Sequence, residues 1–369
     1  MIIRHFLKWA EGARVEQRAA AATALANAYL ANELPFEERC EAEAALTLLL
    51  DDPAPRVRLA LAEAMSLSHR APPQIVAALA QDQPEIAALM ILRSPLLSEA
   101  DLVDRVGGGD PAIQKLVASR PYVPMGAAAA LAELGDERAC LTLLDNGGAD
   151  LAAFSLRRIA ERLGGHGPVR TALLHRRDLP AAVRHMLVQQ LGRALTQAPL
   201  VRGSMGPARA ERLSRESCTA ASLTLIETTP SAEHPALVEH LRLAGEITPA
   251  FLVRIAAHGR MDFLAATVAR LAGRDRVRVN GVLASGGGSA VCSLLRAAGI
   301  AADLHAPLLA ALRIWREVAN GRLVAGPQEA SFTMLKACEP ERPLATVLKA
   351  IHLETLRENA RRHALELAA

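Results

Sequence analysis

The stretch DPAPRVRLALAEAMSL, residues 52–67, decides the fold class of this chain. Its apolar side chains recur three and four positions apart, at Val57, Ala60, Leu61, Ala64 and Met65. That spacing places them in one buried stripe on an α-helix. The Asp-Pro pair in front suits a helix start, because aspartate caps free backbone N–H groups and proline fits the first helical turn. We therefore predict a short amphipathic helix here.

The same arrangement returns downstream. Asp82-Gln83-Pro84 and Asp110-Pro111 each precede another short helical pattern, and Ser98 with Asp101 forms a capping box before a further one. These units recur at roughly 25–31 residues, a length that holds two short helices and is typical of solenoids. We predict an all-α fold, namely an irregular α-solenoid of HEAT-like helical repeats with a C-terminal helical region.

The composition supports this fold class. Hydrophobic residues make up 51% of the chain, but aromatic residues only 3%, so most of the apolar content is alanine and leucine. Both residues favour helices, whereas the aromatic and β-branched residues that suit strands are scarce. We expect a strand content near zero.

Proline and glycine suggest where the other helices begin and end. Thr248-Pro249 predicts a helix start, Pro180 to Gly192 predicts a complete helix, and residues 343–367 predict a long final helix. The stretch 195–209 is rich in proline and glycine and is interpreted as a linker or long loop. These patterns divide the chain into a HEAT-like repeat domain, residues 1–198, and a C-terminal helical domain, residues 199–369, that could continue the superhelix.

Charge is close to balanced, with 42 Lys+Arg against 39 Asp+Glu and a net charge of +3. The first hundred residues carry −4 and residues 201–300 carry +4, which is a mild gradient. Such a balance is unlike the concentrated positive charge of a dedicated nucleic-acid-binding protein.

The middle of the chain is nevertheless rich in arginine. On a solenoid these side chains could align and meet an acidic partner or a phosphate backbone. The simpler interpretation is a solvated face with local ion pairs to Glu161 and Asp178. The candidate interaction surface consists of Arg157, Arg158, Arg162, Arg176, Arg177 and Arg184.

A glycine-rich stretch, Gly286-Gly287-Gly288-Ser289, precedes another predicted helix. Helix N-termini of this kind can hold phosphate, but no P-loop lysine follows it. A turn capped by Ser289 is the simpler interpretation. We found no catalytic motif and no metal-ligand spacing, so we expect no enzyme activity, no cofactor, no metal site and no small-molecule substrate.

The five cysteines are odd in number and widely spaced, without a C-x-x-C pair. This pattern argues against a disulfide framework and against a zinc site, and it fits the cytoplasm. No apolar run reaches the roughly 18–20 residues of a membrane helix, so we expect no membrane association.

Several short segments follow one another in a characteristic order. They are APPQIV (71–76), LRSPLLS (92–98) with DLV (101–103), ASRP (118–121), GD (135–136), LLDN (143–146) and RDLP (177–180), and in the second half ITP (247–249), residues 263–271 and LLRAAGI (294–300). This order resembles the alphaproteobacterial domain-of-unknown-function 2336 family, over roughly residues 15–320. Its repeats are similar to HEAT and leucine-rich-repeat-variant units, so the resemblance implies an all-α solenoid in a bacterial cytoplasm. It brings no catalytic residues with it.

Two functions remain open on the sequence alone. The first is a non-enzymatic protein–protein interaction scaffold or regulatory adaptor, because solenoids present extended surfaces that bind partners without reacting. Its partner would be a protein that the sequence does not identify. The alternative is a nucleic-acid-binding solenoid that uses the arginine-rich stretch 157–193 for phosphate contacts.

Overall fold

Helices account for the whole secondary structure in the part of the chain that the computed structural model describes, residues 8–10, 12–31 and 34–368. Within these residues there is no strand, only an isolated parallel bridge between Val123 and Ala149. The all-α prediction is confirmed. Contacts between residues divide the chain into two compact units, residues 1–179 and 180–369.

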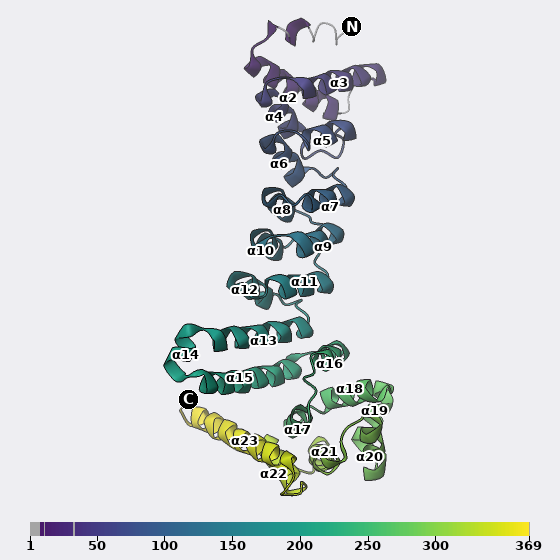
Figure 1. Cartoon of the computed structure of the whole chain (residues 1–369). Helices are drawn as coiled ribbons and strands as arrows, with labels where there is room; N and C mark the ends of the chain where they lie inside the picture. The colour runs from purple at the N-terminus through teal and green to yellow at the C-terminus, as the bar shows by residue number, and fades with distance from the viewer. Residues whose placement is uncertain (1–7, 11, 32–33, 369) are drawn as a thin grey trace. The chain divides into compact units, whose positions relative to one another are not determined.

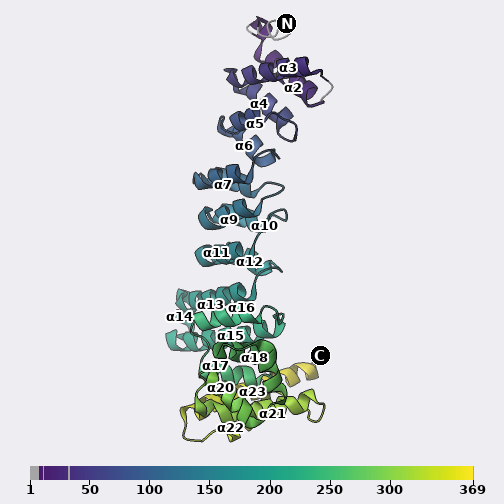
Figure 2. The same ribbon diagram turned by 90° about the vertical axis from the view of Figure 1, so that its right-hand side faces the viewer.

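The first unit is a stack of short helices in sequential pairs (Figures 1 and 2). Its helices are α2 (Val15–Ala31), α3 (Phe36–Leu48), α4 (Pro55–Met65), α5 (Pro73–Leu79), α6 (Pro84–Arg93), α7 (Glu99–Gly107), α8 (Pro111–Ala118), α9 (Met125–Leu134), α10 (Glu137–Asp145), α11 (Ala153–Leu163) and α12 (Gly167–His175), with a 3₁₀ turn η1 (Leu49–Asp51). The even-numbered helices pack on one another in order, and α9 packs between α7 and α11. This arrangement confirms the predicted helical repeat array.

The predicted stripe of α4 forms the core of its repeat. Of the five predicted residues, Val57, Leu61 and Met65 are fully buried, whereas Ala60 and Ala64 are only partly buried. Helix α4 packs against α2, whose buried positions are mostly alanine. Small side chains let the two helices approach closely. The helix starts predicted at Asp110 and Ser98 are confirmed, because Asp110 accepts a hydrogen bond from the Ala112 N–H and Ser98 forms a capping box with Asp101. The start predicted at Asp52-Pro53 is wrong by two residues, because α4 begins at Pro55 after Ala54, and Asp52 accepts a hydrogen bond from the Ala54 N–H at 2.9 Å.

Arginines link one repeat to the next in this unit. Arg18 of α2 donates to both carboxylate oxygens of Asp52, which lies just before α4, at 2.7 and 3.0 Å. Arg58 of α4 repeats the contact one unit later, with Asp82 before α6 at 2.6 and 2.9 Å. Arg58 also donates to the Asp52 carbonyl oxygen at 2.5 Å, and Arg18 donates to the Ala13 carbonyl oxygen at 2.8 Å. Each of these arginines therefore binds one carboxylate and one backbone carbonyl.

Other arginines bind carbonyl oxygens near the ends of helices in the preceding repeat. Arg120 is buried and donates to the Ile91 and Ser94 carbonyls, the latter at 2.8 Å. Arg162 donates to the Ala132 and Gly135 carbonyls at 2.6 and 3.0 Å. The last turn of a helix leaves carbonyl groups without an intrahelical partner, and these guanidinium groups supply one. We call the two kinds of contact the arginine clasps.

The second unit contains longer helices around an apolar core. They are α13 (Ala181–Gln197), α14 (Pro199–Met205), α15 (Pro207–Thr228), α16 (His234–Leu243), α17 (Pro249–Ala257), α18 (Met261–Ala272), α19 (Arg276–Ser285), α20 (Gly288–Ala297), η2 (Ala302–Leu304), α21 (His305–Ala319), α22 (Pro327–Lys336) and α23 (Pro343–Ala368). Phe263 of α18 is the largest fully buried side chain of this core. Trp315 covers Gly259, whose positive φ of 72° ends α17, and donates from Nε1 to the Ala256 carbonyl at 2.7 Å.

Two sequence-based predictions were wrong in this unit. The stretch 195–209 is no linker, because Pro199 and Pro207 start helices α14 and α15 instead of interrupting the chain. Proline fits a first helical turn, where its missing N–H has no intrahelical role. Gly192 does not end α13, which continues to Gln197. The predicted domain division at 198/199 thus falls between α13 and α14, inside the second unit, and stays a prediction.

Candidate interaction surface

The predicted arginine surface begins on α11. Arg157 pairs with Glu161 at 2.9 Å, and Arg158 binds Glu133 of α9 through two hydrogen bonds of 2.5 and 2.7 Å. Arg162, one turn further, is a clasp to α9. The surface is therefore occupied to a large extent by contacts within the stack.

The remaining members of that surface lie on different elements of the chain. Arg176 pairs with Asp178 at 2.7 Å and donates to the Leu144 carbonyl at 2.9 Å. Arg177 is exposed, and the described residues offer it no carboxylate within ion-pair distance. Arg184 is half-buried on α13, in the second unit. The local ion pairs to Glu161 and Asp178 that the sequence suggested both form.

A buried polar cluster lies between α13, α15 and α16. His185 is only 2% exposed, and its Nε2 is 3.0 Å from the Ser222 hydroxyl and 3.3 Å from a Glu246 carboxylate oxygen. Burial, and to a lesser extent the nearby His240, lowers the pKa of His185 to about 4, so the ring is neutral near pH 7. Burial also raises the pKa of Glu246. These groups satisfy one another inside the helical layers, which suits a structural role.

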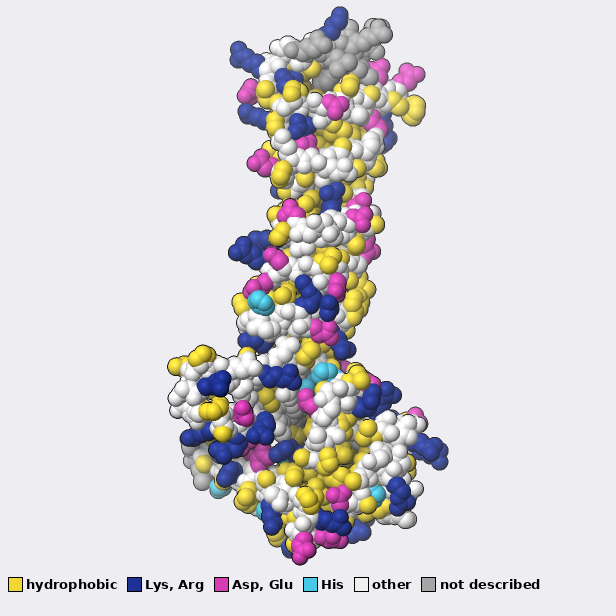
Figure 3. Space-filling view, viewed as in Figure 1, with side chains coloured by type: hydrophobic (Ala, Val, Ile, Leu, Met, Phe, Trp, Pro, Cys, Tyr) yellow, Lys and Arg dark blue, Asp and Glu magenta, His cyan; other side chains and the backbone are white. Residues whose placement is uncertain are grey.

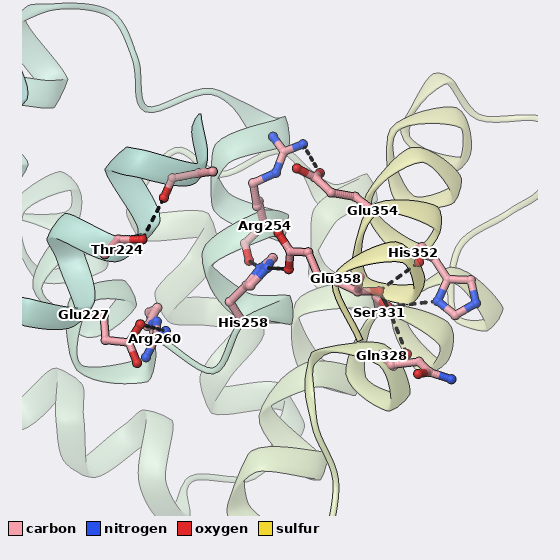
Figure 4. Close-up of polar contacts among 12 residues, drawn as sticks. Thr224, Glu227, Arg254, His258, Arg260, Gln328, Ser331, His352, Glu354 and Glu358 are labelled. Atoms are coloured by element: carbon pink, nitrogen blue, oxygen red, sulfur yellow. Dashed lines mark hydrogen bonds and ion pairs between the residues drawn. The ribbon is translucent and has the colours of Figure 1, made fainter. Parts of the chain in front are cut away.

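A second polar cluster holds the final helix α23 against α17 and α22 (Figure 4). Arg254 pairs with Glu354 at 2.7 Å, His258 lies 3.7 Å from Glu358, and Ser331 is 3.0 Å from His352. A pocket of about 490 Å³ lies beside it, lined by residues of α15, α17 and α23 of both charge signs. Because opposite charges are paired across the helices, this cluster fastens α23 in place.

The glycine-rich stretch 286–289 does not have the predicted cap. Gly287, not Ser289, is the residue before the first helical residue of α20, and no side chain caps this helix start. Arg316 donates to the Gly286 carbonyl at 3.0 Å and to the Leu283 and Val282 carbonyls, which repeats the clasp contact of the first unit. A structural contact therefore accounts for this turn.

Neither a metal centre nor a membrane-spanning segment emerges from the described residues. They contain no group of three or more His, Cys, Asp or Glu side chains placed to hold a metal ion. Their five cysteines are unpaired. Within the same residues, no helix has both the length and the continuous apolar character needed to cross a bilayer.

An open apolar groove is formed by α13, α14 and α15. Its volume is about 430 Å³, and none of its lining residues is charged. The apolar lining comes from all three helices, chiefly Val188, Leu191, Leu195, Val201, Met205 and Leu213. Leu195 is 50% exposed and Leu213 is 39% exposed, so the groove opens to solvent.

The floor of the groove is the crossing of α13 and α15 at Gly192. A Cβ atom at Gly192 would lie 2.5 Å from the Cys218 sulfur and 3.0 Å from the Ser214 hydroxyl. Ser214 donates to the Gly192 carbonyl at 3.1 Å. Only glycine permits this approach, and the small residues at the crossing leave the larger apolar side chains as the walls.

The helices that form this groove are rich in arginine. From residue 184 to residue 217 the chain has six arginines and two acidic residues, Glu211 and Glu216. Arg202 follows the lining residue Val201, and Arg209 lies one helical turn before the lining residue Leu213. Figure 3 shows dark-blue side chains, which are arginines in this segment, with apolar ones and a few acidic ones over α13–α15.

These groove arginines differ from the clasps, because Arg202, Arg209, Arg212 and Arg215 are exposed and form no ion pair with the described carboxylates. The groove was not predicted from the sequence, because residues 195–209 were interpreted as a linker or long loop. The signal that could have revealed it is the helical spacing of Val188, Leu191 and Leu195 followed by Ala210 and Leu213.

A comparison with known protein families gives a match. The model of a protein family described as "Uncharacterised protein conserved in bacteria (DUF2336)" matches residues 86–346. No curated protein matches the chain. No solved structure matches it either.

Proposed function

The chain belongs to the DUF2336 family of bacterial proteins, and from this premise we propose that it is a non-enzymatic protein-interaction scaffold or regulatory adaptor that binds through the α13–α15 groove. The resemblance noted in the sequence is thereby confirmed at the level of the family. The family description assigns no activity, so the proposal depends on the surface of the chain itself.

The apolar groove is the observation that carries the proposal. Leu195 is half-exposed, Leu200 is 85% exposed, and the groove beside them is uncharged. Exposed apolar surface of this kind, bordered by polar residues, typically marks a site of protein association. The stacked repeats of the first unit provide a further extended surface, as is usual in solenoid scaffolds.

The polar clusters support a binding role more than a catalytic one. His185 and Ser222 are buried together, and the charges around α23 are paired across helices. A general base or nucleophile needs access to a substrate, which such internally satisfied groups lack. As part of the same proposal we assign the scaffold to the cytoplasm, because its five cysteines are unpaired.

Nucleic-acid binding along the arginine-rich stretch has less support. Arg158, Arg162 and Arg176 are engaged by carboxylates or backbone carbonyls, which leaves fewer positive charges to bind phosphates. A mobility-shift assay with random duplex DNA at about 50 mM salt checks this alternative, since phosphate contacts are strongest at low salt. We expect no retardation.

Site-specific photo-crosslinking in the bacterial cell tests the scaffold proposal. A photo-crosslinking amino acid in place of Leu195 reports on the groove, and the same amino acid in place of Leu67, which is 69% exposed in the first unit, is the matched control. We expect a protein adduct of defined mass at position 195 that is absent at position 67. The same adducts at both positions, or none at position 195, would contradict the proposal.

A further inference from the structure

We propose that the occupant of the α13–α15 groove is an amphipathic helix of a partner protein, with an apolar stripe flanked by aspartate and glutamate. This inference rests on the proposed scaffold function and names the chemistry of the partner. It follows from three features of the groove: its helical lining, its floor and its charge.

The lining residues form a groove that can accommodate a third helix. On α13 the lining residues Val188, Leu191 and Leu195 lie on one helical stripe, and on α15 Ala210 and Leu213 begin another. The two helices pack side by side and are joined by the short α14 (Figure 1). The side chains of a third helix fit into the groove between two such stripes, as ridges fit grooves in helix packing.

The floor lets that helix lie deep between the walls. At the crossing, Gly192 has no side chain and meets Ser214 and Cys218, which are small. Large side chains from a partner therefore meet backbone and small residues at the floor, with Leu191 and Leu213 on either side. The groove is open along its surface between two helices, which suits the apolar face of a third helix.

The charge around the groove selects an acidic partner. Arg184 lies one helical turn before Val188, Arg202 is on α14, and Arg209 is in the first turn of α15, so each groove helix contributes an arginine near the lining. Arg202 and Arg209 are exposed and without an ion pair among the described residues. Complementary charge at the rim of an interface steers the correct partner and disfavours one of the same sign.

An anionic membrane surface offers the same charge, but the shape favours a helix. Peripheral proteins insert protruding apolar side chains into a bilayer. Here Val188 and Leu191 are only partly exposed, in a recess between helices whose edges are Leu195 and Leu213. We therefore assign the groove to a protein helix, and vesicle binding is one outcome of the test.

Fluorescence anisotropy with three probes and the full chain tests this assignment. The first probe is a labelled helical peptide of about 18 residues with leucines at helical spacing and flanking glutamates. The second has lysine in place of each glutamate, and the third is a vesicle of phosphatidylglycerol and phosphatidylcholine. We expect saturable binding of the glutamate peptide, about ten-fold or more weaker binding of the lysine peptide, and none to the vesicles.

Charge reversal provides the matched variants. Arg202→Glu with Arg209→Glu should reverse the preference between the two peptides, whereas Arg177→Glu, which changes an exposed arginine of the first unit, should leave it unchanged. Leu195→Ser leaves the charge unchanged and should weaken the binding of both peptides. Circular dichroism checks that each variant keeps its helices.

Three outcomes would overturn the assignment: equal or tighter binding of the lysine peptide, no binding of either peptide, or tighter binding to vesicles than to the glutamate peptide. If the peptides fail while photo-crosslinking at position 195 still yields a protein adduct, the acidic helix is wrong and the scaffold function stands. If crosslinking fails as well, both fall.

Discussion

Arginine has different surroundings in the first unit and in the α13–α15 segment of the second. In the first unit, Arg18 and Arg58 each form an ion pair with a carboxylate of the next repeat. Arg120 is buried and donates hydrogen bonds to backbone carbonyls. Around the groove, Arg202 and Arg209 are exposed without an ion pair among the described residues. The same residue type thus stabilises the stack in one region and stays available for a partner in the other.

Exposure explains why the two sets should behave differently. The Arg58 side chain is 12% exposed and that of Asp82 is 14% exposed, so little water competes for their hydrogen bonds. A guanidinium that is fully solvated gains little from a neighbouring charge. Arginine count alone therefore says nothing about binding, and the partner of each side chain has to be known.

The largest effect should come from Arg120, the most buried arginine of the clasps. Arg120→Met removes the donors to the Ile91 and Ser94 carbonyls and leaves both without their partner. We expect the free energy of unfolding of the first unit to fall by about 3 kcal/mol. Urea unfolding followed by circular dichroism measures it, with Arg177→Met as the control that should stay near wild type. A loss below about 1 kcal/mol would show that the buried clasp contributes little.

A smaller effect separates two arginines of the same helix. Arg58→Ala breaks the double hydrogen bond to Asp82 and should lower the free energy of unfolding by about 2 kcal/mol. Arg56→Ala removes only an exposed pair with Glu16 and should lower it by less than about 0.5 kcal/mol. Chemical denaturation of both variants checks the difference. Similar losses in the two would remove the distinction between clasps and solvated pairs.

The second unit should respond to pH through His185. Its folded pKa of about 4 lies below the ordinary value of 6.5, so the unfolded chain takes up the proton first as the pH falls. The contribution of His185 to the free energy of unfolding is therefore fully present above pH 6.5 and is lost toward pH 4. The loss between pH 6 and pH 5 should be about 1 kcal/mol.

His185→Gln is the matched variant for this prediction, because glutamine keeps a polar group beside Ser222 but does not titrate. The raised pKa of Glu246 contributes a slope of opposite sign in both proteins, so their difference reports on His185. Thermal unfolding from pH 4 to pH 7 measures it. Parallel pH profiles for the two proteins would show that His185 does not titrate as its burial requires.

The smallest effect should come from the groove. Arg202→Gln combined with Arg209→Gln removes two exposed charges that make no ion pair with the described residues. We expect the Tm to stay within about 2 °C of wild type. Differential scanning calorimetry checks this result. A drop as large as that of Arg58→Ala would mean that the groove arginines also hold the fold together.

Local patterns in the sequence were sufficient for much of the fold. The stripe of Val57, Leu61 and Met65 and the cap at Asp110 depend only on residues a few positions apart, and both were predicted correctly. Gly192 was misread as a helix end. Whether a glycine ends a helix or allows a second helix to approach depends on the partner, here Ser214 and Cys218 more than twenty residues away.

The candidate surface was harder to predict from the sequence, because its contacts also join residues that are far apart in the chain. The stretch from Arg157 to Arg184 is rich in positive charge, but the acceptors of Arg162 lie about a whole repeat earlier in the chain. No local pattern reveals such pairing. The groove was missed because Pro199 and Pro207 indicate a loop as readily as a helix start until the packing of α13 on α15 is known.

The central claim is that the clasp arginines stabilise the fold and the groove arginines do not. Hydrogen–deuterium exchange of the full chain, followed by mass spectrometry, tests it most directly. It compares wild type, Arg58→Ala and Arg209→Gln peptide by peptide. We predict faster exchange in α2–α6 for Arg58→Ala and an unchanged pattern everywhere for Arg209→Gln. Unchanged exchange in Arg58→Ala, or faster exchange of α13–α15 in Arg209→Gln, would contradict the account.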